Sequence, residues 1–318
     1  MKFSTPLKLF SVSCLVAWAA VNCGAPEEDK ETEKASTSAS ETSTSTGGST
    51  TTQTSGSSGS SGSSCTATAN TTATNTLSTY GCALLTRDTT SCKASREAQG
   101  LSGFWLKFSC SVTLTKSGNN VVIATKNLPD TKSFYYSSTD ACYEAFSSTA
   151  RKANPNKIAS KTVSLTVPYA PTAAATASAT PEGIIGVALN GVAIYDNSAA
   201  PGDDIFNEEA TFDKCDGHPD MSSTYHYHTE PGAITNSDSN FIGVLRDGFP
   251  VYGRNDYNTT TAASGLDSAG GKTGKTVDSP NTDVYHYHLN LQSNGTKSAY
   301  FISAGYYKGT PGTCTGCQ

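Results

Sequence analysis

The histidines are the residues of this chain most able to do chemistry, because all five fall in three short motifs. One stands in Cys-Asp-Gly-His-Pro, and the other four form two copies of Tyr-His-Tyr-His. Neutral imidazole suits zinc, copper, nickel and iron, whereas calcium and magnesium prefer oxygen ligands. The motifs therefore predict a transition-metal site, with copper or zinc as the ion and these ligands: His218, His226, His228, His286 and His288.

Each Tyr-His-Tyr-His is predicted to be a strand, in which residues i and i+2 point to the same face. Two imidazoles then share one face and two tyrosines the other. We interpret the tyrosines as packing residues with a hydroxyl partner. The neighbouring acids Asp213, Asp216, Asp220 and Asp267 are turn residues in the first interpretation, and ligands or partners of a ligating imidazole in the second. A hydrogen-bonded structural cluster of His and Tyr is the alternative to a metal site.

Two segments upstream of these motifs match in order. Residues 185–195 and 242–252 each contain an apolar run, an Asn-Gly or Asp-Gly pair, and a second apolar run that ends in Tyr. Such a pair favours a β-hairpin with a type I′ turn. We therefore interpret residues 184–300 as a tandem duplication. Its copies are expected to pack about a pseudo-twofold axis that brings the two histidine pairs onto neighbouring strands around one ion.

The two copies differ at the third histidine. Cys215 and His218 of the first copy align with Ala269 and Lys272 of the second. Cys215 and His218 have the Cys-x-x-His spacing of many zinc sites, but the number of cysteines favours a disulfide at Cys215. The second copy therefore has no counterpart to the fifth imidazole.

The rest of the folded chain also has strand character. Apolar and polar residues alternate at 104–114, 119–125 and 161–167, which predicts three more strands. One helix is expected near 140–152, and a linker or a long surface crossing is expected at 171–181. The predicted fold is mainly β, with a duplicated β-hairpin-containing domain that is sandwich- or barrel-like and follows a disordered N-terminal tether.

The first 23 residues read as a lipoprotein-type signal peptide. Lys2 and Lys8 precede an apolar run that is short for a membrane span, and the run is followed by Cys23. Acylation of Cys23 would then hold the protein to a membrane by lipid alone. Residues 24–64 are rich in Ser, Thr, Gly and Glu and predict a disordered tether. The expected location is the bacterial outer membrane or cell surface.

The charge of the chain excludes some partners. The net charge of -5 includes the acids of the tether, so the folded part is close to neutral. It has no basic stripe and no basic amphipathic helix, which argues against binding to nucleic acid or directly to a membrane surface. A metal ion is the partner that the sequence predicts, and a protein partner stays unknown.

The cysteines predict a disulfide framework. Eight of the ten remain once Cys14 of the signal and Cys23 are set aside, and an even number in an exported chain favours four disulfides. Five precede residue 150 and three follow it, so at least one bridge must join the two parts. We expect no free thiol and a bridge from Cys215 to Cys314 or Cys317. The predicted disulfide cysteines are Cys65, Cys82, Cys92, Cys110, Cys142, Cys215, Cys314 and Cys317.

These observations divide the chain into four predicted parts. The signal peptide occupies 1–23 and the tether 24–64. A β-rich, cysteine-rich region follows at 65–175, and the duplicated domain occupies 176–318.

The motifs of the last part resemble the YHYH-domain family, a group of mostly bacterial exported proteins and lipoproteins named for the tetrapeptide. The resemblance covers about 186–288 through Gly-Val-Ala-Leu-Asn-Gly-Val-Ala-Ile-Tyr, Cys-Asp-Gly-His-Pro-Asp, Gly-Phe-Pro-Val-Tyr-Gly and both Tyr-His-Tyr-His motifs, and is weaker over 118–168. The family commonly has Pro-Asn/Asp-His and a second Cys-x-Gly-His. This chain has Leu-Pro-Asp-Thr at 128–131 and Ala-Gly-Gly-Lys at 269–272 instead. The resemblance implies the domain rather than an activity.

The predicted function is that of an exported, lipid-tethered protein that binds a transition-metal ion through clustered histidines. A metal-dependent hydrolase or oxidase is the second hypothesis, and it requires an open coordination position with a general base nearby. A metal-free surface interaction or structural module is the third. A cleft lined by acids beside the histidines would favour the enzyme, whereas a closed four-ligand site would favour storage or structure.

Overall fold

The computed structural model describes residues 65, 67–70, 80–146 and 148–317. They all belong to one compact unit, Ser58–Gln318. The predicted signal peptide, the lipidation residue Cys23 and the tether lie outside the described residues. Within the described ranges, no helix combines the length and the apolar character that crossing a membrane requires.

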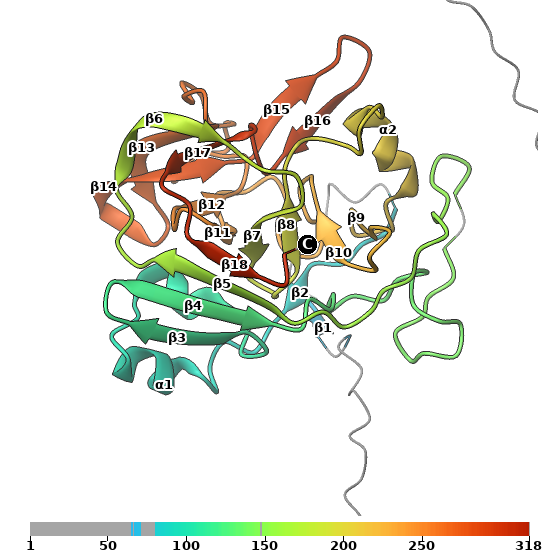
Figure 1. The fold of residues 1–318 in the computed structure, drawn as a ribbon, viewed down its shortest axis with the longest axis horizontal. Helices are drawn as coiled ribbons and strands as arrows, with labels where there is room; N and C mark the ends of the chain where they lie inside the picture. The colour runs from blue at the N-terminus through green and yellow to red at the C-terminus, as the bar shows by residue number, and fades with distance from the viewer. Residues whose placement is uncertain (1–64, 66, 71–79, 147, 318) are drawn as a thin grey trace, which may run out of the picture. The chain divides into compact units, whose positions relative to one another are not determined.

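The described chain is mainly β, as predicted (Figure 1). Its helical segments are short: α1 (Lys93–Ala98), η1 (Gly103–Lys107), α2 (Ile205–Glu208) and η2 (Glu209–Thr211). The first strands are β1 (Thr68–Ala69), β2 (Leu85–Thr86), β3 (Thr113–Ser117), β4 (Asn120–Thr125), β5 (Val163–Pro168) and β6 (Ala173–Ala179). The central strands are β7 (Ile184–Ala188), β8 (Ala193–Tyr195), β9 (Gly217–Pro219), β10 (Tyr225–Tyr227), β11 (Phe241–Leu245), β12 (Pro250–Tyr252), β13 (Gly271–Thr276) and β14 (Ser279–His288). The last are β15 (Asn290–Ser293), β16 (Ser298–Phe301), β17 (Tyr306–Gly309) and β18 (Thr313–Thr315).

The central strands form one open, eight-stranded sheet in the order β13-β14-β12-β11-β7-β8-β10-β9. Its two halves have the same construction outward from the middle. In one half, β7 pairs antiparallel with β8, β8 pairs in parallel with β10, and β10 pairs antiparallel with the edge strand β9. In the other half, β11, β12, β14 and the edge strand β13 pair in the same three ways. The halves meet through the antiparallel pair β7 and β11, so a pseudo-twofold axis passes between these two strands.

Both predicted hairpins are present, but their turns differ from the prediction. Gly191 and Gly248 have φ values of 88° and 87°, whereas Asn190 and Asp247 are not among the residues with positive φ. A type I′ turn needs positive φ at both central positions, so that assignment is wrong. Leu245 N donates to Phe249 O and Gly248 N donates to Leu245 O. This is the pattern of a three-residue loop that ends in a glycine bulge.

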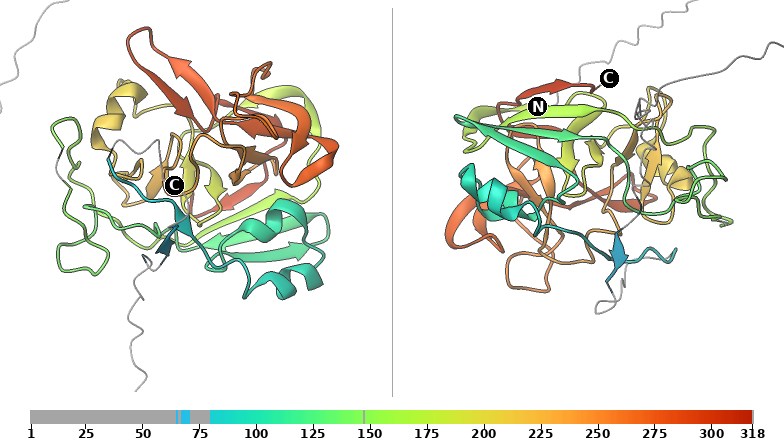
Figure 2. Two further views of the ribbon diagram at one scale, coloured as in Figure 1. Left: turned by 180° about the vertical axis from the view of Figure 1, so that it is seen from behind. Right: turned by 90° about the horizontal axis from the view of Figure 1, so that it is seen from below.

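A second sheet, in the order β18-β5-β4-β3, packs against one face of the central sheet (Figure 2). The core between them combines β4 and β5 residues such as Ile123 and Leu165 with central residues such as Val187 and Val244. A separate core on the central strands contains Tyr225, Tyr227 and Tyr287. The sandwich alternative of the predicted fold is therefore the one adopted.

Three local predictions were wrong or incomplete. The described residues within 140–152 contain no helix. Asp140 Oδ1 instead accepts a hydrogen bond from Cys142 N at 2.8 Å, which forms a turn, and Cys142 is bridged to Cys65. Residues 104–114 are only partly a strand, since their aromatic start forms η1. The predicted linker at 171–181 contains β6, which pairs with β17.

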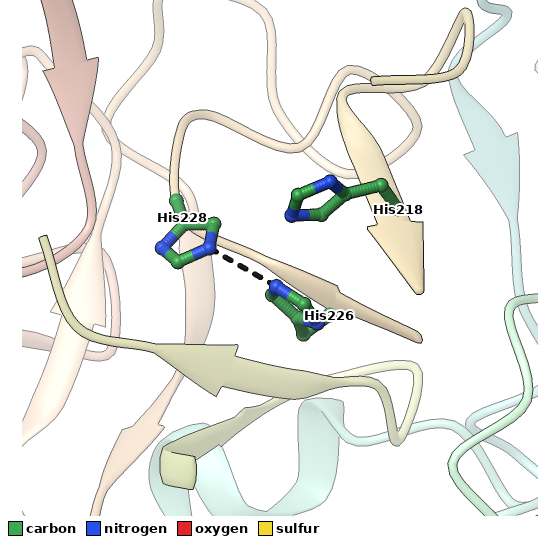
Figure 3. Close-up of side chains that lie close together, drawn as sticks. All are labelled: His218, His226 and His228. Atoms are coloured by element: carbon green, nitrogen blue, oxygen red, sulfur yellow. Dashed lines mark hydrogen bonds between the residues drawn. The ribbon is translucent and has the colours of Figure 1, made fainter. Parts of the chain in front are cut away.

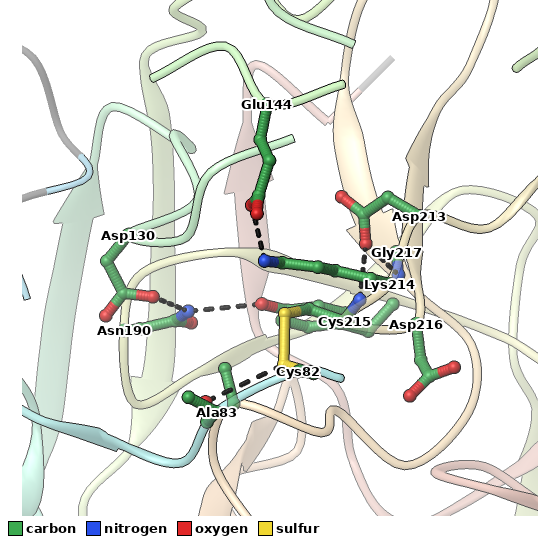
Figure 4. The surroundings of a disulfide bond; sticks show 12 residues. Cys82, Ala83, Asp130, Glu144, Asn190, Asp213, Lys214, Cys215, Asp216 and Gly217 are labelled. Atoms are coloured by element: carbon green, nitrogen blue, oxygen red, sulfur yellow. Dashed lines mark hydrogen bonds and ion pairs between the residues drawn. A yellow bond between two sulfur atoms is a disulfide. The ribbon is translucent and has the colours of Figure 1, made fainter. Parts of the chain in front are cut away.

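All eight cysteines of the described chain are paired, as Cys65–Cys142, Cys82–Cys215, Cys92–Cys110 and Cys314–Cys317. The predicted bridge between the two parts of the chain exists, but the expected partner of Cys215 was wrong. Cys215 lies in the turn before β9 and pairs with Cys82 (Figure 4). Cys314 lies on β18 in the other sheet, beside β5. It pairs there with Cys317, three residues further along the chain.

Candidate metal centre

Three of the five histidines meet at the β9 edge of the central sheet. His218 on β9 and His226 on β10 are register partners, and His228 follows β10 directly. One nitrogen from each ring lies within 4.8 Å of the others, and all three side chains are buried. Figure 3 shows the rings turned toward a common space. Among the described residues this is the only group of three or more His, Cys, Asp or Glu with such spacing.

Hydrogen bonds at the opposite ring nitrogens fix the tautomer of each imidazole. His226 Nδ1 is 2.9 Å from Thr224 O, and His228 Nδ1 is 2.6 Å from Asp196 O. A carbonyl oxygen only accepts, so both Nδ1 atoms carry the proton and donate it. Each Nε2 therefore keeps a lone pair, which is the arrangement that outer partners impose on ligating histidines.

His218 is held in the same tautomer. Its Nδ1 is 2.7 Å from Thr211 Oγ1, and that hydroxyl donates its own proton to Glu208 O at 2.8 Å. The hydroxyl must then accept from His218 Nδ1–H. His218 Nε2 is buried and has no hydrogen-bond partner within the part of the chain that the structure describes. An unsatisfied buried polar atom costs about 1–3 kcal/mol.

The lone pairs of His226 and His228 face each other. Their Nε2 atoms are 3.0 Å apart, the contact drawn as a dashed line in Figure 3. With both protons at Nδ1, neither neutral ring has a donor for this contact. A cation bound by the three Nε2 atoms would remove this conflict and also satisfy His218.

Burial keeps the three rings neutral. It lowers the pKa of His228 to about 4 and the pKa values of His218 and His226 well below 6.5, and His228 adds to the effect at His218. Desolvation disfavours the charged form of a base, and the neutral form is the one that ligates a metal.

A pH dependence of stability follows for the metal-free protein. The folded-state pKa of His228, about 4, lies below its value of 6.5 when unfolded, so its stabilising contribution is present above pH 6.5 and is lost as the pH falls toward 4. We expect a loss of about 3 kcal/mol from this residue alone. Urea unfolding of chelator-treated protein at pH 7 and pH 4 measures it. A His228→Gln variant should fall less steeply over the same interval, and equal slopes would contradict the assignment.

A carboxylate and an open pocket complete the site. Glu208 Oε2 is 3.5 Å from His218 Nε2 and 3.4 Å from His228 Nε2. Burial raises the pKa of Glu208, and the carboxylates of Asp203 and Asp196 raise it further. A pocket of about 510 Å³ opens over the three rings, and the described residues that line it include no Lys or Arg. The acids that line it are Glu182, Asp196, Asp203, Glu208 and Asp220.

The prediction that both histidine pairs share one ion is wrong. Four strands, β12, β11, β7 and β8, separate β14 from β10. The hairpin strands β7 and β11 meet at the pseudo-twofold axis, and the histidine strands lie outside them. His286 and His288 are therefore in a second, separate position near the other edge of the sheet.

That second position repeats the hydrogen bonds of the histidine pair but replaces the groups around it. His286 Nδ1 is 2.9 Å from Val284 O, His288 Nδ1 is 2.8 Å from Gly253 O, and the two Nε2 atoms are 3.0 Å apart. Lys272 pairs with His286 in the register that His218 takes with His226. Its ammonium group donates to Asp256 at 2.8 and 3.0 Å. Lys272 thus takes the place of the third imidazole, and Asp256 takes the place of Glu208.

Two of the acids near the motifs, Asp213 and Asp267, are turn residues, as the first interpretation held. Asp213 accepts from Cys215 N at 2.9 Å and from the Tyr225 hydroxyl at 2.8 Å. Asp267 repeats this with Ala269 N and the Tyr285 hydroxyl, both at 3.0 Å. The motif tyrosines are packing residues with hydroxyl partners, as predicted: Tyr225, Tyr227 and Tyr287 are buried, Tyr285 is partly buried, and all four hydroxyls are hydrogen-bonded.

Two site residues were missed by the sequence reasoning. Glu208 reaches the site from α2, and Thr211 orients His218 from η2. Glu208 stands in an acidic stretch that also contains Asp203, Asp204 and Glu209. No spacing rule separates it from these neighbours, so sequence alone offered no signal.

The architecture and the site define a class: a mainly β domain with two equivalent half-sheets and a buried histidine cluster at one edge. The model of the family described as YHYH protein matches residues 164–265. The chain thus contains a domain of the YHYH family, and the matched segment includes all three clustered histidines. Neither the curated proteins nor the solved structures provided a match to this chain.

Proposed function

We propose that His218, His226 and His228 bind one transition-metal ion, copper or zinc, through their Nε2 atoms. The observation that carries the proposal is a cluster of three buried, neutral imidazoles that bring one nitrogen each within 4.8 Å of the others, and whose Nε2 atoms face no donor among the described residues. A metal-free structural cluster would pair these atoms with donors, as the Nδ1 atoms are paired. His286 and His288 are not ligands of this ion in the proposal.

We further propose that this centre is carried outside the cytosol on a lipid anchor at Cys23. Four disulfides are typical of a protein that folds in an oxidising compartment. The signal-like N-terminus and the polar segment 24–64 support a tethered protein at the bacterial outer membrane or cell surface. Metabolic labelling with a fatty acid, compared between the wild type and Cys23→Ala, tests this part.

A metal-dependent hydrolase or oxidase is the second candidate, and one feature favours it over a storage site. The three imidazoles face a pocket of about 510 Å³ instead of a closed fourth ligand. Catalytic metal sites combine three protein ligands with an open position. Glu208, 3.4–3.5 Å from two of the ligating atoms, is placed to act as a fourth ligand or as a general base.

The decisive experiment is elemental analysis of protein purified from its native host without a chelator or His-tag. We expect one copper or zinc ion per chain. The chain supplies a matched pair of variants, since His226 and His286 hold the same place in their motifs. His226→Ala should contain no ion, whereas His286→Ala should retain one.

Thermal melts with and without a chelator extend this test. An ion at 100 times its Kd stabilises the folded state by about 2.7 kcal/mol, so a chelator should lower the Tm of the wild type and of His286→Ala. It should leave His226→Ala unchanged. A wild type with no copper or zinc and no metal-induced shift would leave only the structural interpretation.

A further inference from the structure

The side chain of Met221 is unusually placed for a large apolar residue. It is 91% exposed and lines the same pocket as His218, His226 and His228. Met1 is the only other methionine of the chain. The mouth of the histidine pocket therefore holds the single thioether of the described residues.

The turn that carries Met221 is fixed to the histidine cluster. It joins β9 to β10, the two strands that supply His218 and His226. Asp220 Oδ1 accepts from the backbone N–H groups of Ser222 and Thr224 at 2.8 and 2.9 Å. These bonds hold the turn in one shape.

A second contact joins the turn to a ligand ring. The Tyr195 hydroxyl donates to Asp220 Oδ2 at 2.7 Å, and the Tyr195 ring stacks on His226 with centroids 3.7 Å apart. The backbone of the turn at Met221 is thus held at a set position relative to His226.

The donor chemistry of this mouth is specific. Thioether sulfur is a soft ligand that selects Cu(I), while zinc is well served by imidazole and carboxylate. The acids of the pocket raise the local concentration of cations, since no Lys or Arg is among the described lining residues. A cation that is also soft is therefore the species this entrance suits best.

We propose that Met221 is the entry ligand of the centre: Cu(I) binds its thioether first and then passes to the three imidazoles. This inference rests on the proposed metal site and names its ion. Because Met221 is an exposed ligand at the mouth, it accelerates loading and release alike and leaves the final affinity unchanged.

The test is the rate of Cu(I) transfer from a chromophoric Cu(I) chelator to the full chain under anaerobic conditions, compared with the rate of Zn(II) uptake. Met221→Leu removes the sulfur from an exposed side chain of similar size, so the fold is retained. We expect Cu(I) loading to slow by about tenfold, the equivalent of about 1.4 kcal/mol in the barrier. Zn(II) uptake and the Cu(I) affinity should stay within twofold.

Oxidation provides an internal control. Mild peroxide converts methionine to a polar sulfoxide that lacks the soft donor. It should slow Cu(I) loading of the wild type to the rate of Met221→Leu and leave that variant unaffected, which also controls for Met1.

The possible failures are distinguishable. A wild type that takes up neither Cu(I) nor Zn(II) would overturn the metal site itself. Equal Cu(I) rates in the wild type and Met221→Leu, or a loss of affinity without a loss of rate, would overturn only the entry role.

Discussion

Replacing His218 by lysine should abolish uptake of the ion while the domain stays folded. The second half of the sheet carries lysine in the same register position, so the fold accommodates an ammonium group beside the histidine pair. His218→Lys removes one of three ligands and introduces a positive charge beside the other two, both of which oppose binding of a cation. The metal content should fall from one ion per chain to none.

The reciprocal change, Lys272→His, tests the same argument by a gain of function. It places a third imidazole opposite His286 and releases Asp256, whose Oδ1 is 3.7 Å from His288 Nε2. We expect the chain to bind two ions, measured by elemental analysis after loading and desalting. His218→Lys combined with Lys272→His should bind one. A double variant without an ion would show that the two positions are not equivalent, despite their matching hydrogen bonds.

The local features of the centre followed from the sequence because they depend on short-range geometry. Residues i and i+2 of an extended segment lie on the same face, which brings His226 and His228 together. The Asn-Gly and Asp-Gly pairs form hairpins. The absence of a third imidazole at Lys272 was also readable from the repeat. These features require no knowledge of how distant strands pair.

The arrangement of the two pairs depends on long-range pairing and could not be read in the same way. Parallel pairing of β8 with β10 and of β12 with β14 moves each histidine strand away from the axis. A sheet with the hairpin strands at its centre and a sheet with the histidine strands at its centre would both satisfy the same hydrophobic pattern. Glu208 was missed for a related reason, because a crossover between β8 and β9 brings it to the site.

The disulfides show a similar limit. An even number of cysteines predicts complete pairing, but eight cysteines can be paired in many different ways. The partner of Cys215 was decided by the path of residues 80–87, which runs beside Ala233 and buries Cys82. That path has no periodic pattern that would predict it.

Removal of the Cys82–Cys215 bridge should cost more stability than removal of either of two shorter bridges. The bridge joins residues 133 apart in sequence, whereas Cys92–Cys110 spans 18 and Cys314–Cys317 spans 3. Loop-closure entropy in the unfolded chain gives losses of about 5, 3 and 2 kcal/mol in that order. Urea unfolding of the three double Cys→Ala variants, each treated with a chelator, measures the series.

The Cys82–Cys215 variant should also lose the ion more readily than the other two. Cys215 lies in the turn that leads into β9, and the Asp213 carboxylate accepts from Cys215 N within the same turn (Figure 4). Loosening this turn frees the strand that carries His218, so the weakest metal binding should accompany the largest loss of stability. The Cys92–Cys110 variant is the control, because neither of its cysteines is among the described residues that line the pocket over the imidazoles. Equal losses in all three variants would show that chain entropy does not govern the contribution of these bridges.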